Sequence, residues 1–500
     1  AVAAVQFLPT LDVLQSSSRQ VADSAFYRGG HLHPVNAAQL GSPYMFDKRV
    51  AGGNTHEFGF YLGAIPALLI VWLLTQWRSL GSLRPLAAAA LLAAAATFVL
   101  SWGDLGGLYK LQTWLPIVGR FRLPARYLVL TELSLSVVAA CGWAVFFRGR
   151  TSATATEPEA TSKSWRTLFR VTLAFAAVSL AAAWIWGNEH VASWTMRLLG
   201  PGLLLVGLGL TCLAPTRRWA VAAMILFTAC DLAAYGGSYA IWRNTYPWST
   251  AVGSLRGPEA ANSQQRLATE LPLPSGKPPQ IRLGDQLTLA GYRQVDGYAG
   301  LEPQRRLDYR QPAALRAAGV HWVHAGRDHA PPQGEHVDGN WWKISNPQPR
   351  AALLPEVQPS RDPNRDIAHV DLRRTALVDD DPQQRRVFAT LPVRTAETDQ
   401  SPPPQGTSDP SQSQIIEDRP GLLKIHTDSE EPRILVVTER FHPGWQALVD
   451  GTQAAVVRAN GEFLGCVLPA GAHNVQFEFA PASLRWGKRI SLVALAMFAR

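Results

Sequence analysis

Long apolar runs fill the half of the chain that precedes Tyr246, and polar, proline-rich sequence fills most of the rest. A helix that crosses roughly 30 Å of hydrocarbon at 1.5 Å per residue needs about 20 mostly apolar residues. Six runs reach or approach that length: Phe58–Trp77, Pro85–Trp102, Tyr127–Phe147, Leu168–Trp186, Leu198–Leu213 and Trp219–Tyr235. Buried helices of a soluble protein are usually shorter. The pattern therefore predicts a transmembrane bundle of six full spans over residues 1–239.

Both ends of the chain lie inside apolar sequence. The stretch AVAAVQFLPTLDVL begins at Ala1 without the basic start that a signal peptide requires. At the other end, ISLVALAMFAR is about half as long as a membrane span. We interpret the first stretch as a truncated first span and residues 485–500 as the start of a truncated last span. The chain is therefore expected to be a fragment of a longer protein.

Basic residues in short loops predict the orientation, because they are enriched on the cytoplasmic side. They gather in alternate gaps between the spans, at Arg78 and Arg84, at Arg148 to Arg170, and at Arg217 and Arg218. Those gaps are assigned to the cytoplasm, which leaves four segments outside: Gln15–Glu57, Gly103–Arg126, Gly187–Arg197 and Ala240–Lys488. The large polar half is therefore predicted to be extracytoplasmic.

Alternation of apolar and polar residues returns in the last hundred residues, with turn dipeptides such as Asp450-Gly451 between the runs. This pattern predicts a small antiparallel β-sandwich domain over residues 415–484. Before it, residues 391–414 form a Pro-, Ser- and Gln-rich stretch that is typical of a flexible linker. Residues 240–390 give weaker signals, which favour an extracytoplasmic α/β region. The predicted fold class is thus a polytopic α-helical membrane protein with a C-terminal extracytoplasmic α/β region and a β-sandwich domain.

Composition and charge exclude several other classes. Lys and Arg number 47 against 38 Asp and Glu, which gives a net charge of +9, and four cysteines occur without a disulfide or metal spacing. The cations are not gathered on one aromatic-studded face, and membrane loops account for most of the excess. We therefore expect no nucleic-acid partner. No cofactor is expected either, because Walker and dinucleotide motifs are absent from the sequence.

The outer segment GDLGGLYKLQTWLPIVGRFRLPARY carries cations on the side where topology does not require them. Its Gly and Pro residues indicate short interfacial helices rather than a span. Guanidinium groups form paired hydrogen bonds with two oxygens of a phosphate. The candidates for binding a phosphate at the membrane surface are therefore Lys110, Arg120, Arg122 and Arg126. Contact with lipid headgroups, or pairing with acidic loop residues, is the alternative explanation.

The first outer loop offers a second set of polar candidates. His56 and Glu57 lie at the mouth of a predicted span, where we expect them to line the substrate cavity; Glu57 either pairs with a loop arginine or contacts sugar hydroxyls. The pair His31 and His33 has metal-ligand spacing, but solvated or structural histidines are the commoner case, and no metal site is predicted.

For two acids and two aromatic residues, the sequence allows either a structural role or a role in the chemistry. Glu132 and Asp231 lie inside predicted spans, where a buried acid is expected to have a partner. Structural pairing is favoured over a catalytic role. In the predicted sandwich, Phe441 and Trp445 either stack on a sugar ring or fill the core, and the core is the commoner place for aromatics in strands.

Four segments carry a resemblance to known proteins: FLPTLDVLQSS, GRFRLPARYLVL, VDGYAGLEPQRRLDY and the long stretch from FHPGWQALVDG to HNVQFEFAP that precedes the last apolar run. Together they resemble the bacterial YfhO-type membrane proteins, and the resemblance runs from Ala1 to Arg500. Such proteins are similar to C-type membrane glycosyltransferases. The resemblance implies that sugar is transferred from a polyprenyl-phosphate donor to an envelope glycan or teichoic-acid-like acceptor, outside the inner (plasma) membrane.

The resemblance also implies roles for the candidates. The loop cations would bind donor phosphate, whereas the catalytic base would be an Asp in an N-terminal segment that this fragment lacks; Asp47 lies in a later loop and does not match. The catalytic residue is therefore unknown, and the fragment is expected to be inactive. A non-enzymatic component that assembles, transports or binds envelope glycans together with membrane lipid is the alternative function.

Overall fold

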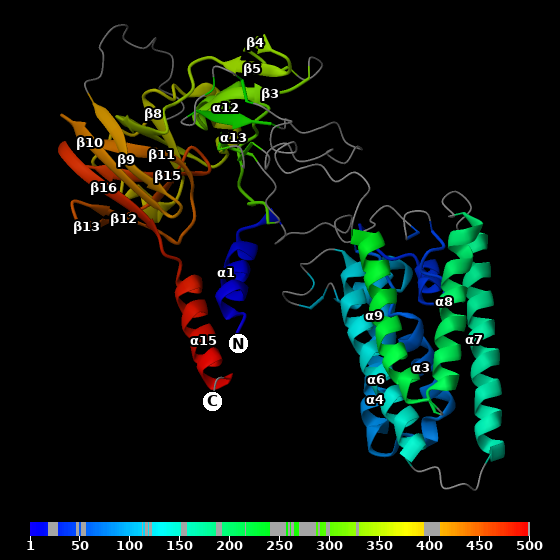
Figure 1. Cartoon of the computed structure of the whole chain (residues 1–500). Coiled ribbons are helices and arrows are strands. Elements are labelled where there is room, and N and C mark those ends of the chain that lie inside the picture. Colours follow the sequence, from blue (N-terminus) through cyan, green and yellow to red (C-terminus); the bar gives the residue numbers. More distant parts are fainter. Residues whose placement is uncertain are drawn as a thin grey trace. The chain divides into compact units, whose positions relative to one another are not determined.

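The structure is a computed structural model. It describes residues 1–18, 29–46, 50–51, 57–112, 114–115, 119, 123–151, 158–186, 193–215, 217–240, 257–258, 261, 265–269, 287–288, 291–296, 301–326, 330–394 and 411–498. The chain divides into two units (Figure 1). The helical unit comprises Ala22–Thr245, and the β unit comprises Ala1–Val21 together with Tyr246–Arg500.

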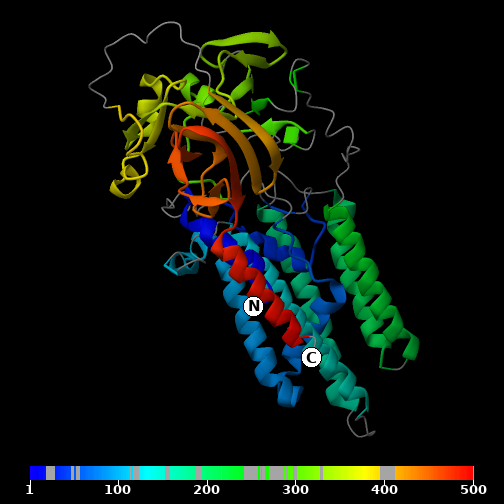
Figure 2. The same ribbon diagram turned by 90° about the vertical axis from the view of Figure 1, so that its left-hand side faces the viewer.

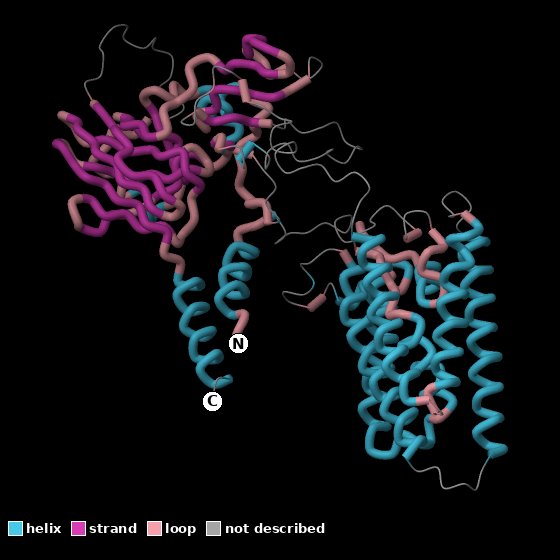
Figure 3. Tube along the Cα trace, in the orientation of Figure 1, coloured by secondary structure: helices cyan, strands magenta, loops and turns pink. Residues whose placement is uncertain are grey.

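Each of the six predicted apolar runs coincides with a helix of the helical unit. These helices are α3 (Ala64–Thr75), α4 (Arg84–Ser101), α6 (Leu128–Thr151), α7 (Pro158–Trp186), α8 (Trp194–Leu213) and α9 (Arg218–Ala240). Short helical turns connect or precede them: η2 (Pro34–Leu40), η3 (Trp77–Leu83), η4 (Gly103–Leu105), α5 (Leu108–Gln112) and η6 (Pro124–Tyr127). Figure 3 shows that helices form nearly all the regular structure of this unit.

Four helical segments among the described residues are long and apolar enough to cross a membrane. They are Trp77–Ser101, Pro124–Phe147, Thr195–Leu213 and Arg218–Ser238. Large apolar side chains such as Leu92, Leu133 and Leu226 are exposed on their surfaces. Many exposed apolar side chains on helices of this length mark contact with lipid or with another protein. The chain is therefore a membrane protein with these four candidate spans.

The apolar run Phe58–Trp77 predicts a longer helix than the structure contains. Helix α3 covers only 12 residues. The chain before it is buried but not helical, and Gly63 turns it with a φ of 94°. Side chains satisfy this backbone instead of helical hydrogen bonds. The Gln39 amide bonds the Phe58 carbonyl and the Phe60 N–H at 3.1 and 3.0 Å. Irregular backbone at membrane depth is tolerated where protein groups satisfy it in this way.

Three sheets build the β unit. Strands β1 (Arg266–Ala268), β2 (Arg293–Gln294), β3 (Val320–His324), β4 (Gly334–Asp338) and β5 (Trp341–Ile344) form the first, in the order β2-β1-β3-β5-β4. Strands β6 (Ala351–Leu354), β7 (Glu356–Ser360), β8 (Thr375–Asp379), β11 (Arg433–Arg440), β14 (Val457–Ala459) and β15 (Phe463–Leu468) form a six-stranded sheet, in the order β6-β11-β15-β14-β8-β7. The third contains β9 (Gln412–Arg419), β10 (Leu422–Ser429), β12 (Trp445–Val449), β13 (Thr452–Ala454) and β16 (Gly471–Phe479), in the order β13-β12-β16-β10-β9.

The six-stranded sheet carries a core on each of its two faces. On one face, side chains such as Leu435 and Leu464 pack with Ile425 and Phe477 of the third sheet. On the other face, residues such as Ile434 pack with the first sheet and with the helix α12 (Pro312–Ala317). Three short helices, α13 (Pro363–Asp366), η8 (Ile367–His369) and α14 (Pro382–Arg385), complete this layer.

Strand pairing crosses the boundary that the sequence predicts at residues 391–414. Strand β6, which precedes that segment, pairs antiparallel with β11 after it, with Ala352 opposite Val436. Strand β7 pairs in parallel with β8, and β8 pairs with β14. The six-stranded sheet therefore takes strands from both sides of the predicted linker, whose residues 395–410 lie outside the described chain. Such pairings depend on side chains that meet only in the folded chain, so no local pattern reveals them.

Local turn signals are confirmed. Asp450 and Gly451 have φ values of 48° and 84° and join β12 to β13, as expected for a two-residue hairpin of type I′. Asn460 and Gly461 have φ values of 46° and 83° between β14 and β15. Within the region predicted as α/β, the helix α12 is followed directly by the strand β3.

The two ends of the chain pair as helices within the β unit. Helix α1 (Ala4–Gln15) lies beside α15 (Ala482–Phe498), and both views show them next to one another (Figures 1 and 2). The Ser491 hydroxyl accepts a hydrogen bond from the Val5 N–H at 2.9 Å, and Ser483 donates to Asp12 at 2.6 Å. A Cβ atom at Gly487 would come within 2.6 Å of the Ala4 carbonyl oxygen. Small residues thus let the two helices approach closely, as they do in membrane helix pairs.

Candidate functional site

The loop before α6 brings two predicted site residues together. Arg126 donates from Nε and Nη2 to the same oxygen of Glu57, at 2.9 and 2.7 Å. The arginine side chain is 61% exposed and the glutamate 18% exposed, so Glu57 holds a guanidinium that still faces the surroundings. The sequence left two roles open for Glu57, pairing with a loop arginine or contact with sugar hydroxyls. In the structure Glu57 pairs with a loop arginine.

Local backbone geometry fixes the position of Arg126. Leu123 adopts a left-handed conformation with φ of 73°, and Pro124 then begins η6. The Ala125 N–H donates to the Gly30 carbonyl at 3.2 Å, which ties this turn to the first outer loop. A Cβ at Gly103 would meet Pro124 at 2.9 Å, so the turn also packs closely against the end of α4. Helix α6 starts directly afterwards, and its N-terminus adds positive potential near Arg126.

Lys110 lies on α5, the short helix that the Gly- and Pro-interrupted segment predicts. Tyr109 and Gln112 of this helix are buried, whereas Leu108, Leu111 and Trp114 are exposed, Trp114 by 79%. Exposed apolar and aromatic side chains beside a lysine are typical of a segment at the membrane surface. Arg120, Arg122, His56 and Asp47 lie outside the described residues, so their predicted roles stay predictions.

Asp231 has the buried partners that its place in a predicted span requires. Its Oδ2 atom accepts hydrogen bonds from the Tyr61 hydroxyl at 2.8 Å and from the Ala64 N–H at 2.9 Å. Tyr235, one turn further along α9, donates to Gln39 at 3.0 Å. These bonds fasten the chain before α3 to α9, whereas the buried Oδ1 atom of Asp231 has no hydrogen-bond partner in the described chain.

The other polar candidates of this unit give a mixed result. The Glu132 carboxylate has no hydrogen bond or ion pair within the described part of the chain, although a partner was expected. The Nδ1 atom of His33 accepts from the Val35 N–H at 3.3 Å and caps η2, which is a structural role. No group of three or more His, Cys, Asp or Glu residues that could hold a metal occurs in the searched, described residues.

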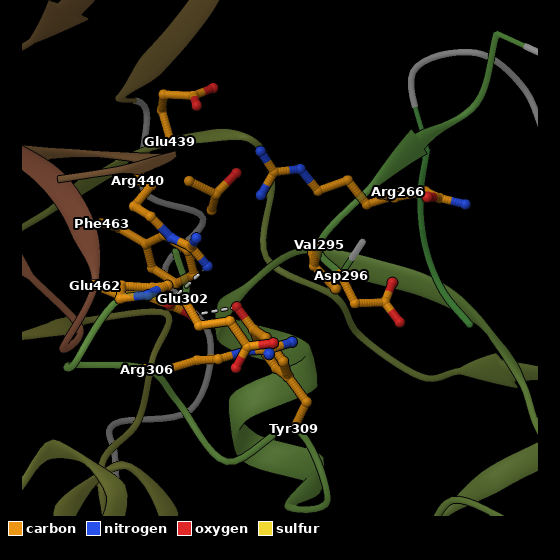
Figure 4. A pocket seen from close by; sticks show the side chains of 13 residues that line it. Arg266, Val295, Asp296, Glu302, Arg306, Tyr309, Glu439, Arg440, Glu462 and Phe463 are labelled. Atoms are coloured by element: carbon orange, nitrogen blue, oxygen red, sulfur yellow. Dashed lines mark hydrogen bonds and ion pairs between the residues drawn. The ribbon is translucent and has the colours of Figure 1, made fainter. Parts of the chain in front are cut away.

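A second polar centre, which the sequence did not predict as a site, lies in the β unit. A cavity of ≈ 310 Å³ lies between the first sheet, the segment that follows residue 301, and the turn before β15. Figure 4 shows the side chains that line it. Glu462 lies in that turn and is only 2% exposed. It accepts a hydrogen bond from the Tyr309 hydroxyl, and Arg440 Nη2 lies 3.5 Å from its other oxygen.

Charge and burial determine the protonation states of the groups in this cavity. Burial, followed by the negative charge of Glu462, raises the pKa of Tyr309 well above its usual value, so the phenol remains a hydrogen-bond donor at neutral pH. Burial lowers the pKa of the Arg266 guanidinium, yet an arginine stays protonated in proteins. Arg266 therefore carries a positive charge in a largely desolvated place, where a counter-group is energetically favoured.

Several of these groups retain hydrogen-bonding capacity towards the cavity. Arg266 donates to the Ala318 carbonyl at 3.2 Å, but no carboxylate of the described residues lies within 4.0 Å of it. Arg306 lies over the Tyr309 ring at 5.3 Å and likewise has no ion pair in the described chain. The buried Nε2 atom of Gln294 has no acceptor there. Buried polar groups are normally satisfied, so each exception needs an explanation.

A second cavity of ≈ 400 Å³ adjoins the first and is more apolar. Phe441, Trp445 and Phe479 contribute aromatic surface, and Arg440 and Glu462 line both cavities. Trp445 and Phe479 have ring centroids 5.3 Å apart, and the Arg458 guanidinium lies 4.7 Å from the Phe441 ring. Phe441 and Trp445 also pack against the core between the sheets. Both residues therefore belong to the core and also line a cavity. The sequence presented core packing and stacking on a sugar ring as alternatives.

The comparisons with known proteins agree with the sequence resemblance at the C-terminal end. The family model of the bacterial membrane protein YfhO matches residues 409–491. This segment is therefore similar to the YfhO family. It contains every strand from β9 to β16 and more than half of α15. No curated protein and no solved structure matches the chain. The YfhO match includes Glu462, Phe441 and Trp445, so the β-unit cavities lie partly inside the matched segment.

Proposed function

We propose that this protein is a glycosyltransferase-like integral membrane protein of the cell envelope. It transfers a sugar from a polyprenyl-phosphate-linked donor to an envelope glycan or teichoic-acid-like acceptor on the outer face of the inner membrane. The YfhO segment and the candidate spans support a membrane role. The two sheets that share a core support the further proposal of an extracytoplasmic β-sandwich.

The ion pair between Arg126 and Glu57 is the observation that carries the proposal. Glu57 accepts from Nε and Nη2 and thereby fixes the plane of the guanidinium, while Nη1 makes no hydrogen bond among the described residues. An arginine that is charged, oriented and 61% exposed is suited to a phosphate ligand. Exposed Leu111 and Trp114 nearby in the sequence would contact the lipid chains.

The chemistry follows from the charge on the leaving group. An acceptor hydroxyl attacks the anomeric carbon of the donor sugar, the bond from that carbon to the phosphate oxygen breaks, and the hydroxyl proton passes to a base. The departing lipid phosphate gains negative charge during this step. Arg126 at the start of α6 would stabilise that charge, and fixed donors of this kind accelerate a reaction when they bind the transition state more tightly than the substrate.

The proposed topology assigns the Arg126 end of the helical unit to the outside. Helices α4, α7 and α9 end there and α3, α6 and α8 begin there, so the chain leaves α9 at that end. The opposite end carries η3 with Arg78, and the turn with Arg217 and Arg218. This distribution of cations supports a cytoplasmic location for that opposite end.

Membranes that contain or lack the full-length protein provide the functional test. Right-side-out vesicles would receive polyprenyl-phosphate donors with different radiolabelled sugars, and label in envelope polymer would be counted. We expect one donor to label the polymer only when the protein is present, and reintroduction of the gene to restore labelling. Equal labelling in both kinds of membrane for every donor would contradict the proposed transfer reaction.

A further inference from the structure

The two adjoining cavities of the β unit have a chemistry that the transfer reaction does not use. We infer that together they form one binding site for a neutral oligosaccharide. One sugar ring would occupy the polar cavity beside Arg266 and Arg306, and the next would stack on Trp445 in the aromatic cavity. Glu462, which lines both cavities, would act as a positioning residue that holds Tyr309 and Arg440.

The polar cavity presents donors and acceptors together. Arg266 and Arg306 have no ion pair in the described chain, and the buried Nε2 atom of Gln294 has no acceptor there. Glu302 and Glu439 supply carboxylate acceptors from the same lining (Figure 4). Every sugar hydroxyl both donates and accepts, and planar guanidinium and carboxylate groups bond neighbouring hydroxyls in pairs. A sugar ring would therefore supply an acceptor for the buried Nε2 atom of Gln294 and further hydrogen bonds for Arg266 and Arg306.

The balance of charge disfavours an anionic ligand in the same cavity. Three arginines and four carboxylates line it, so a phosphate would meet more negative than positive groups. A neutral ligand with many hydroxyls avoids this repulsion. The volume of ≈ 310 Å³ lies at the lower end of the roughly 300–1,000 Å³ that small-molecule sites occupy, as expected for one or two sugar rings.

The aromatic cavity supplies the other half of a carbohydrate site. Its lining is more apolar than that of the first cavity, and Trp445, Phe441 and Phe479 contribute ring surface to it. The C–H face of a sugar ring is apolar and packs well against an aromatic face. Pro303, Arg440 and Glu462 border both cavities, so a chain of linked sugars can continue from one to the other.

The wall between these cavities is anchored to the terminal helices. The Ser18 N–H donates to the Glu302 carbonyl at 2.8 Å, and the Gln304 N–H donates to the Ser16 carbonyl at 2.9 Å. Val13 and Ser16 at the end of α1 line the aromatic cavity, as does Phe479 shortly before α15. The site therefore lies where the paired helices join the sheets. It would hold a glycan at the base of the β unit.

This inference goes beyond the proposed reaction, because binding a free oligosaccharide requires neither the lipid donor nor transfer. The test uses the full chain in lipid nanodiscs or in a detergent without a sugar headgroup, since glycoside detergents would occupy the site. Saturation-transfer NMR would screen neutral trisaccharides of glucose, galactose and N-acetylglucosamine, with inorganic phosphate as the anionic probe. Binding would then be titrated for Arg306→Gln, for Trp445→Ala and for the matched control Arg373→Gln, which lines a cavity that shares no residue with the proposed site.

We expect at least one neutral trisaccharide to bind, and Arg306→Gln and Trp445→Ala each to weaken it about tenfold or more, because each removes a direct contact. Arg373→Gln should leave binding unchanged. Because Trp445 also packs in the core, Arg306→Gln decides the matter if Trp445→Ala does not fold. The inference is overturned if none of the trisaccharides binds, if binding survives Arg306→Gln, or if inorganic phosphate competes for the site.

Discussion

Arg126→Gln should weaken binding of polyprenyl phosphate by roughly 10- to 100-fold, because loss of a charge-assisted hydrogen bond costs about 1.5–3 kcal/mol. The glutamine removes the positive charge and cannot reach both Glu57 and a phosphate. Equilibrium binding of radiolabelled polyprenyl phosphate to the chain in nanodiscs measures the effect.

Two further variants distinguish the proposed role from a general effect of charge. Glu57→Gln keeps the guanidinium but weakens its orientation, so we expect a smaller loss of affinity than for Arg126→Gln. Arg78→Gln changes an exposed arginine at the opposite end of the helical unit and should leave affinity unchanged. Equal losses in Arg126→Gln and Arg78→Gln, or none in either, would refute a specific phosphate site at Arg126.

Glu462→Leu should destabilise the β unit by about 1–4 kcal/mol. The change strands the buried Tyr309 hydroxyl, which costs roughly 1–3 kcal/mol, and removes an ion pair with the partly exposed Arg440, which contributes roughly 0–1 kcal/mol. Hydrogen exchange of β15 peptides in the full chain reports this loss, because exchange follows the local free energy of opening.

A double variant tests whether the Tyr309 contact is the cause. Tyr309→Phe removes the stranded hydroxyl, so the pair Tyr309→Phe and Glu462→Leu should be less destabilised than Glu462→Leu alone. If the two changes instead add as independent effects, the hydrogen bond contributes little and the burial of Glu462 needs another explanation.

The sequence predicts those parts of the fold that depend on neighbouring residues. Apolar runs predict the helices, and Asp450-Gly451 predicts its hairpin, because hydrophobic length and turn conformation are local properties. The start of α3 is not predictable in this way. It depends on Gln39 and Asp231, which satisfy the backbone before the helix from distant parts of the chain.

The candidate sites likewise divide into features that local sequence reveals and features that depend on distant residues. The cations of the loop before α6 are visible in the sequence, since they break the expected distribution of charge, and the pairing of Arg126 with Glu57 was one of two stated possibilities. The β-unit cavities were missed. Glu462 follows Asn460-Gly461 and resembles an exposed turn residue, but in the fold it is buried and contacts Tyr309, 153 positions away, and Arg440. The segment VDGYAGLEPQRRLDY, singled out for its family resemblance, pointed to the polar cavity. Phe441 and Trp445, named as possible sugar-stacking residues, pointed to the aromatic cavity.

The most direct test of a phosphate-binding site at the outer membrane surface is photo-crosslinking in right-side-out vesicles. The probe is a polyprenyl phosphate with a photoreactive group beside the phosphate, and mass spectrometry locates the adducts. We predict adducts within residues 103–126 or at Glu57 that unlabelled polyprenyl phosphate prevents and the matched polyprenol does not. Adducts elsewhere in the chain, or equal competition by the alcohol, would contradict the account, because the protein would then bind the lipid without recognising its phosphate.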